Sequence, residues 1–80
     1  MAVYVDNAGV EVNGIGCFHM TADDDVELEE MAERLDLDPN WREVGSTGRS
    51  FYLVNRQRRP EALTYGAKPI SRVKMARLSR

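Results

Sequence analysis

The chain has 80 residues, enough for one domain but too few for two independent hydrophobic cores. Apolar residues make up 42% and charged residues 30%, which is ordinary for a globular protein, and no apolar run approaches the roughly 20 residues of a membrane span. The single cysteine, Cys17, excludes an internal disulfide framework, and the first residues lack the basic and apolar regions of a signal peptide. We therefore expect a cytoplasmic protein without a membrane partner.

Residues 2–5 form a short apolar run that indicates a buried, central strand. Apolar and polar side chains alternate over residues 10–12, as in the arm of a hairpin. Residues 17–20 indicate a second buried strand. These segments place the start of a sheet in the first quarter of the chain.

A helix is expected from about residue 25 to residue 35, with Asp24 at capping-box spacing from Glu27. Its apolar side chains recur at helical spacing and should pack against the sheet: Leu28, Met31, Ala32 and Leu35. Glu29 and Glu33 fall on other sides of the helix, so we expect both to be solvated and their replacement by alanine to be nearly silent.

Asp38 and Pro39 predict a short helical turn that places Trp41 over the edge of the core. Gly45–Gly48 is expected to be a loop, and residues 50–54 are expected to form the third strand.

A second helix is predicted over residues 56–65, capped by Asn55 and ended by Gly66, although Pro60 would kink a helix that began at Asn55. Residues 68–70 predict an edge strand because they include a proline. Ser71 is expected to cap a last short helix that runs through Leu78.

The elements follow one another in the order β-β-α-β-α-β, with a short basic C-terminal helix or tail. This order predicts a compact two-layer α+β domain spanning the whole chain. A domain of this size buries only about 60% of the surface that its unfolded chain exposes. Self-association, as a homodimer for example, would add stability.

Charge is strongly divided along the chain, although the formal net charge is only −2. Residues 1–40 hold eleven acidic residues and one basic residue, a balance of −10, whereas residues 41–80 hold two acidic and ten basic residues, a balance of +8. Such asymmetry suggests a charged partner, nucleic acid among others. The alternative is that the acidic and basic segments pack side by side, through surface ion pairs worth only about 0–1 kcal/mol each.

Asp6, Cys17 and His19 are the residues near strand ends that could bind a metal or carry out catalysis. A zinc site takes about four ligands, and one cysteine with one histidine does not supply them. A thiol inside an apolar strand also differs from the accessible thiolate that a nucleophile requires. We therefore expect no metal, no cofactor and no catalytic activity, with a small hydrolase based on Asp6 and His19 as the least favoured alternative.

Two charged sets remain as candidate binding residues. The basic set comes from the second helix and the C-terminal segment: Arg56, Arg58, Arg59, Arg72, Lys74 and Arg77. The acidic set comes from the first helix: Asp24, Glu27 and Glu30. Arginine outnumbers lysine eight to two in residues 41–80, which suits contacts to phosphate or carboxylate, and we expect Arg58 and Arg59 to be exposed. Helix capping and a solvated face explain the acidic set without any partner.

Several short motifs occur along the chain: Ala-Val-Tyr-Val-Asp at 2–6, Cys-Phe-His-Met-Thr-Ala-Asp at 17–23, Glu29-Glu30-Met31-Ala32, Trp41, Arg58-Arg59, Ala62-Leu63 and Gly66-Ala67. Together they resemble, over residues 2–70, the small bacterial and phage proteins grouped as domain of unknown function 4031. The third strand of that family begins with a His-Tyr-Asp motif, where this chain has Phe51-Tyr52-Leu53.

The resemblance implies that two polar residues that would join Asp6 and His19 in a polar cluster are absent. Any catalytic or metal site of the family would then be lost in this chain. The resemblance also implies a small phage-type accessory protein, and it supplies no activity.

The sequence therefore predicts a binding protein without enzymatic activity, whose basic second half contacts nucleic acid. The alternative is a protein–protein interaction module. Such a module would dock on a host or phage protein, or on a second copy, through its acidic helix or through its basic tail facing an acidic protein surface.

Overall fold

The computed structural model describes residues 2–7, 9–45 and 48–78. A mixed sheet forms its centre, with the strands in the order β4-β5-β3-β1-β6 and with β2 paired to β3 beyond the end of β1. The strands are β1 (Val3–Val5), β2 (Val10–Val12), β3 (Ile15–Ala22), β4 (Glu43–Val44), β5 (Ser50–Asn55) and β6 (Lys68–Pro69). Strands β1 and β6 are parallel, and the other pairs are antiparallel.

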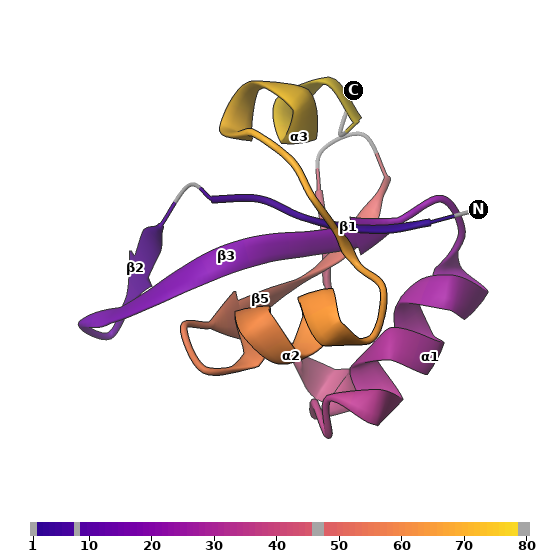
Figure 1. Ribbon diagram of the computed structural model, residues 1–80, viewed down its shortest axis with the longest axis horizontal. Coiled ribbons are helices and arrows are strands. Elements are labelled where there is room, and N and C mark those ends of the chain that lie inside the picture. Colours follow the sequence, from indigo (N-terminus) through magenta and orange to yellow (C-terminus); the bar gives the residue numbers. More distant parts are fainter. Residues whose placement is uncertain (1, 8, 46–47, 79–80) are drawn as a thin grey trace.

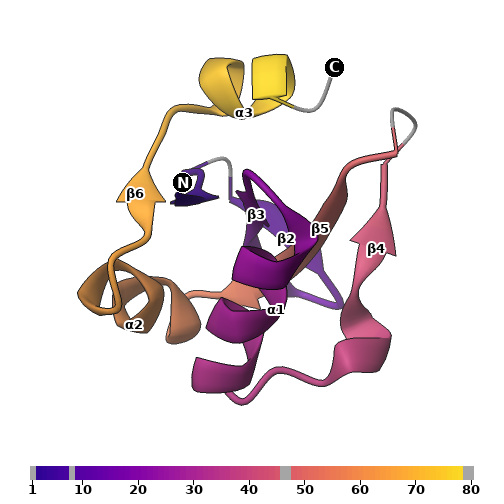
Figure 2. The ribbon, with the colours of Figure 1, turned by 90° about the vertical axis from the view of Figure 1, so that its right-hand side faces the viewer.

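The helices lie on both faces of this sheet. They are α1 (Asp25–Arg34), the 3-10 helix η1 (Pro39–Trp41), α2 (Arg58–Thr64) and α3 (Arg72–Leu78). Figures 1 and 2 show α1 and α2 against one face of the sheet and α3 over the opposite face. The predicted α+β class is confirmed, and β1 lies inside the sheet, as its apolar sequence indicates.

The core fills the space between the sheet and helices α1 and α2. Val5, Met20 and Tyr52 stand opposite one another on β1, β3 and β5, and each is 0% exposed. Leu28, Met31, Ala32 and Leu35 are buried, so the predicted apolar face of α1 is confirmed. The helix begins where the sequence predicts, because Asp24 Oδ1 accepts the Glu27 N–H at 2.8 Å.

The β2–β3 hairpin turns at Asn13 and Gly14. Their φ angles are +52° and +79°, and two successive positive angles are typical of the type I′ turn that suits a two-residue hairpin. Val12 and Ile15 flank the turn as register partners. β3 therefore begins two residues earlier than the predicted strand.

Helix α2 begins later than predicted, and this removes the conflict at Pro60. Asn55 Oδ1 accepts the backbone N–H groups of Gln57 and Arg58 at 3.0 and 2.8 Å, so the helix begins at Arg58. Pro60 then falls in the first turn, where the helix has no use for its N–H. Gly66 ends the helix as predicted, with a φ of +104°.

Two details near η1 differ from the prediction. Trp41 is 58% exposed instead of covering the core, because Leu37, which is 8% exposed, already closes the core at this end. The short strand β4 was not predicted, since two residues carry no periodicity. Residues 46 and 47 of the predicted Gly45–Gly48 loop lie outside the described residues.

Helix α3 begins as predicted, with Ser71 Oγ accepting the Lys74 N–H at 3.1 Å. Met75 is the buried residue of α3, and just before the helix the Ile70 N–H donates to the Val5 carbonyl at 2.9 Å. The burial of Met75 and this hydrogen bond hold the C-terminal segment to the sheet. Among the described helices, none has the length and apolar character needed to cross a bilayer.

Candidate functional site

A carboxylate–imidazole pair lies at the end of β1. Asp6 is 1% exposed, and its Oδ2 lies 2.9 Å from His19 Nδ1. The second carboxylate oxygen accepts the His19 backbone N–H at 2.9 Å, and the Asp6 N–H donates to the His19 carbonyl at 3.0 Å. The pair therefore extends the β1–β3 ladder beyond Val5 and fixes one side of the imidazole.

The neighbours of His19 across β5 are apolar. Leu53 lies opposite His19 in the register of β3 and β5, and the Phe51 ring centroid is 5.6 Å from that of the imidazole. Residues 51 and 53 are the positions at which the family resemblance implies a histidine and an aspartate. The structure places both beside His19, so the implied polar cluster is reduced in this chain to Asp6 and His19.

Cys17 lies on the same face of β3 as His19, two residues away. It is buried, and its thiol donates to the Ile15 carbonyl at 3.6 Å. Within residues 2–7, 9–45 and 48–78, no three histidine, cysteine, aspartate or glutamate side chains are grouped closely enough to hold a metal ion. The arrangement can orient one imidazole, which is what a buried carboxylate does for a histidine.

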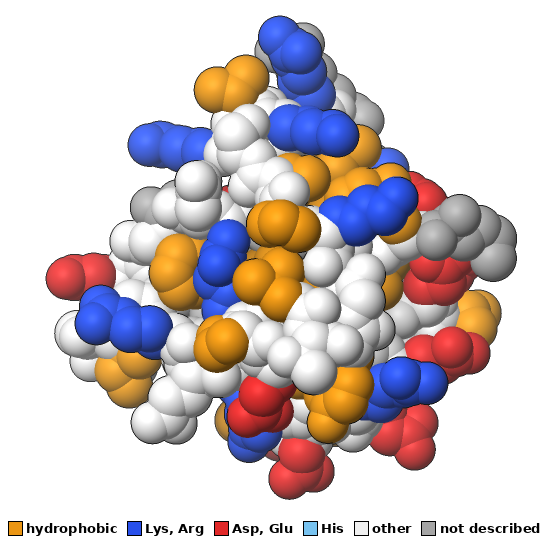
Figure 3. Space-filling view, viewed as in Figure 1, with side chains coloured by type: hydrophobic (Ala, Val, Ile, Leu, Met, Phe, Trp, Pro, Cys, Tyr) orange, Lys and Arg blue, Asp and Glu red, His pale blue; other side chains and the backbone are white. Residues whose placement is uncertain are grey.

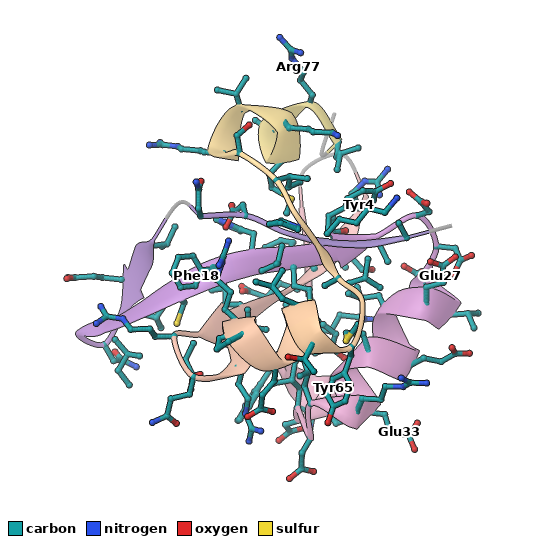
Figure 4. All side chains as sticks on the ribbon, viewed as in Figure 1. Tyr4, Phe18, Glu27, Glu33, Tyr65 and Arg77 are labelled. Carbon is teal, nitrogen blue, oxygen red and sulfur yellow. The ribbon has the colours of Figure 1, made fainter. Side chains whose placement is uncertain are left out.

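Arg59, one of the six predicted basic residues, has a structural contact in the fold. Its Nε donates to the Asp6 carbonyl at 2.9 Å, and its guanidinium lies over the Phe18 ring, 5.2 Å from the centroid. Figure 4 shows Phe18 on β3, above α2. Arg59 therefore ties α2 to the end of β1.

The six predicted basic residues fall into two groups on opposite faces of the sheet. Arg56, Arg58 and Arg59 accompany α2, on the same face as α1. Arg58 and Arg59 are half-buried, not exposed as predicted, because each guanidinium contacts a neighbour; Arg58 Nη1 lies 3.4 Å from Glu61 Oε2. Arg56 is exposed.

The second group is the basic surface of α3: Arg72, Lys74 and Arg77. All three are exposed, and the seven residues of α3 include no acidic residue. Figure 4 shows Arg77 pointing away from the body of the protein, and Figure 3 shows lysine and arginine side chains over α3, at the top of the view, while most acidic side chains in view lie lower down or to the right.

The acidic residues predicted for α1 are only partly available to a partner. Asp24 caps the helix, and Glu27 is half-buried with a side-chain Oε1 that has no hydrogen-bond partner among the described residues. Burial, reinforced by the charge of Asp24, raises the pKa of Glu27 above its ordinary value. Glu30 is exposed and lines, with Glu27, a shallow hollow of about 270 Å³.

The acidic helix α1 and the basic helix α3 lie on opposite faces of the sheet and do not pack against each other. The basic residues that accompany α2 lie on the same face as α1, so the alternative in which acidic and basic segments pack side by side stays open for that part of the chain. Arg42 and Glu29, whose Nη1 and Oε1 lie 3.4 Å apart, form an exposed ion pair between the two halves of the chain.

Sequence reasoning missed the contact between Tyr52 and Glu29. The buried Tyr52 hydroxyl lies 3.1 and 3.0 Å from the two carboxylate oxygens of Glu29. Burial and this hydrogen bond raise the pKa of Tyr52 to about 12. Tyr52 is the residue of the implied His-Tyr-Asp motif that this chain retains. Its hydroxyl joins β5 to α1 on the face of the sheet opposite His19.

A groove of about 650 Å³ opens beside η1 and the β2–β3 hairpin. We call it the Trp41 groove: Val12, Ile15, Trp41 and Leu53 form its apolar lining, and Asp36 and Glu43 add carboxylates. Ile15 is 56% and Trp41 58% exposed. The one signal for this groove in the sequence is the valine and isoleucine residues of the β2–β3 hairpin, and the structure leaves strand β2 exposed throughout.

Comparison with known proteins identifies the family but no individual relative. Residues 3–80 match the family described as protein of unknown function (DUF4031). The searches of curated proteins and of solved structures found no match. The resemblance seen in the sequence is thus confirmed over nearly the whole chain, and the protein belongs to the DUF4031 family.

Proposed function

We propose that this protein binds nucleic acid through the basic surface of α3, without catalysing a reaction. The observation that carries the proposal is the separation of charge: Arg72, Lys74 and Arg77 are exposed on one face of the sheet, and α1 with its acidic residues lies on the other. A cationic face without nearby carboxylates on its own helix suits a polyanion.

The size of α3 sets the number of contacts. Seven residues make a helix about 10 Å long. Duplex DNA carries one negative charge per roughly 1.7 Å of its axis, so about six phosphates lie within that length. Each of the three cations can therefore reach a phosphate of its own, which corresponds to weak binding without base recognition.

Anchoring of α3 supports a defined orientation for these cations. Met75 is buried under the helix, and Arg77 points outward in Figure 4. Viewed down the axis of α3, Arg72 and Lys74 fall on either side of Met75. The guanidinium of arginine also favours bidentate contact with phosphate.

The test is a titration of labelled duplex DNA and single-stranded RNA, followed by fluorescence anisotropy over a series of salt concentrations. With three phosphate contacts on the duplex, the slope of log K against log salt should be about −2.7. Arg77→Gln should reduce the magnitude of this slope by about 0.9, since one contact is lost.

Arg34→Gln is the matched control, because it also removes one positive charge from a helix, but from α1. Its slope should equal that of the wild type. Equal losses in both variants would show that net charge alone governs binding. No binding of either nucleic acid at low salt would rule out the proposal.

A further inference from the structure

The Trp41 groove has the properties of a docking site. Its volume of about 650 Å³ falls within the roughly 300–1,000 Å³ that binding pockets have. Ile15 and Trp41 keep more than half of their surface exposed, at 56% and 58%. Apolar side chains gathered in this way on a small domain mark an interaction surface.

The charges in the groove indicate the chemistry of its occupant. Asp36 and Glu43 line it, and neither forms an ion pair with another described residue. Arg58 also lines it, but its guanidinium lies beside Glu61. The groove therefore suits an apolar side chain that is flanked by positive charges.

The chain itself carries such a segment on α3. Val73 is 63% exposed, and Arg72, Lys74 and Arg77 surround it in the sequence and on the helix. Arg77 follows Val73 by one helical turn, so the two side chains lie next to each other on the outer side of α3. We define this pair, with Arg72 and Lys74 beside it, as the α3 apex.

We propose that the α3 apex of a second copy of this chain docks into the Trp41 groove, with Val73 against Ile15 and Trp41 and the cations toward Asp36 and Glu43. The groove is formed by the sheet edge, the hairpin and η1, whereas α3 is a separate element, so the two contacting surfaces differ. A contact of this head-to-tail kind leaves one groove and one apex free at the ends, and assembly continues until it closes.

Trp41 is the only tryptophan, so its emission reports on the groove directly. Association measured by sedimentation velocity should increase with protein concentration and decrease with salt, and the emission of Trp41 should move to shorter wavelength in parallel. Ile15→Lys should disable the groove, and Val73→Glu should disable the apex. Either change should raise the dissociation constant about tenfold or more.

Mixing the two variants separates this geometry from any symmetric dimer. The Ile15→Lys protein keeps an intact apex, and the Val73→Glu protein keeps an intact groove, so a mixture should form a one-to-one dimer and no longer assembly. If Ile15→Lys also carries Trp41→Phe, the emission of the mixture comes only from the intact groove and should shift on mixing.

Val26→Glu is the matched control for Val73→Glu, because Val26 is a 67% exposed valine on α1 and is not among the residues that line the groove. It should associate like the wild type. A wild-type protein that stays monomeric at every concentration overturns the proposal. So do an assembly without a Trp41 shift and a mixture of the two variants that stays monomeric.

Discussion

Tyr52→Phe tests whether the hydroxyl of Tyr52 holds β5 to α1. The substitution keeps the ring, which is 0% exposed, and removes the donor that lies 3.1 and 3.0 Å from the Glu29 oxygens. A hydrogen bond to a charged group contributes about 1.5–3 kcal/mol. The Glu29 side chain is 39% exposed, so screening by water reduces this to about 1–2 kcal/mol.

The expected loss is measurable by thermal unfolding. In a domain of this size each kcal/mol corresponds to a change in Tm of about 4–8 °C, so Tyr52→Phe should lower Tm by roughly 4–16 °C. Tyr65→Phe is the control: Tyr65 is 45% exposed, and its hydroxyl donates to no described residue. Glu29→Ala should also destabilise the protein, contrary to the expectation from its place on α1.

The pH dependence gives a second readout. The pKa of Tyr52 is raised to about 12 in the folded protein from about 10, so its stabilising effect is complete below pH 10 and is lost as the pH rises through 12. The difference in unfolding free energy between wild type and Tyr52→Phe should therefore be constant near neutral pH and shrink above pH 10. Equal Tm values for Tyr52→Phe and Tyr65→Phe, or a difference that persists through pH 12, would refute the reasoning.

Three further predictions concern α1 and α3. Leu28→Ala should cost about 2–5 kcal/mol in urea denaturation because Leu28 is 1% exposed, whereas Val26→Ala, at 67% exposed, should be nearly silent. Glu27→Gln should raise Tm at pH 7, since burial raises the pKa of the carboxyl and its charged form is disfavoured in the fold. This gain should shrink as the pH falls through the raised pKa and be lost below the ordinary value of about 4.5. Glu33→Gln, at an exposed position of the same helix, is the control and should leave Tm at pH 7 near the wild-type value. An excess of duplex DNA should dissociate any self-assembly detected by sedimentation, because the DNA and the groove of a second copy compete for the same surface of α3.

The elements that the sequence predicts well are those fixed by local interactions. Helix α1 has its cap at Asp24 and its apolar face within one stretch of the chain, and both are found in the structure. The hairpin arm expected at residues 10–12 is likewise local and is found as β2, whereas the turn at Asn13 and Gly14 that closes the hairpin was not predicted, although both residues tolerate positive φ. The final helix follows from its local cap at Ser71.

The contacts that the sequence does not predict join segments far apart in the chain. Tyr52 and Glu29 are 23 residues apart, and Arg59 and Asp6 are 53 residues apart. Each of these side chains also has a plausible local environment: Glu29 on a solvated helix, and Arg59 on an exposed one. Only the stacking of α1 and α2 on the same face of the sheet brings the partners together.

Asp6 gives a last test, which separates the effect of charge from that of geometry at the Asp6–His19 pair. Asp6→Ala removes the acceptors of the His19 N–H and Nδ1 and should cost about 1–3 kcal/mol in urea denaturation, whereas the exposed neighbour Asn7→Ala should stay within about 0.5 kcal/mol. Asp6→Asn can keep both hydrogen bonds, since its oxygen accepts the His19 N–H while its amide donates to Nδ1. That arrangement requires the Nε2-protonated tautomer, which ¹⁵N chemical shifts report. Asp6→Asn should therefore cost clearly less than Asp6→Ala; equal costs would show that the fold needs the charge of the carboxylate and not only its geometry.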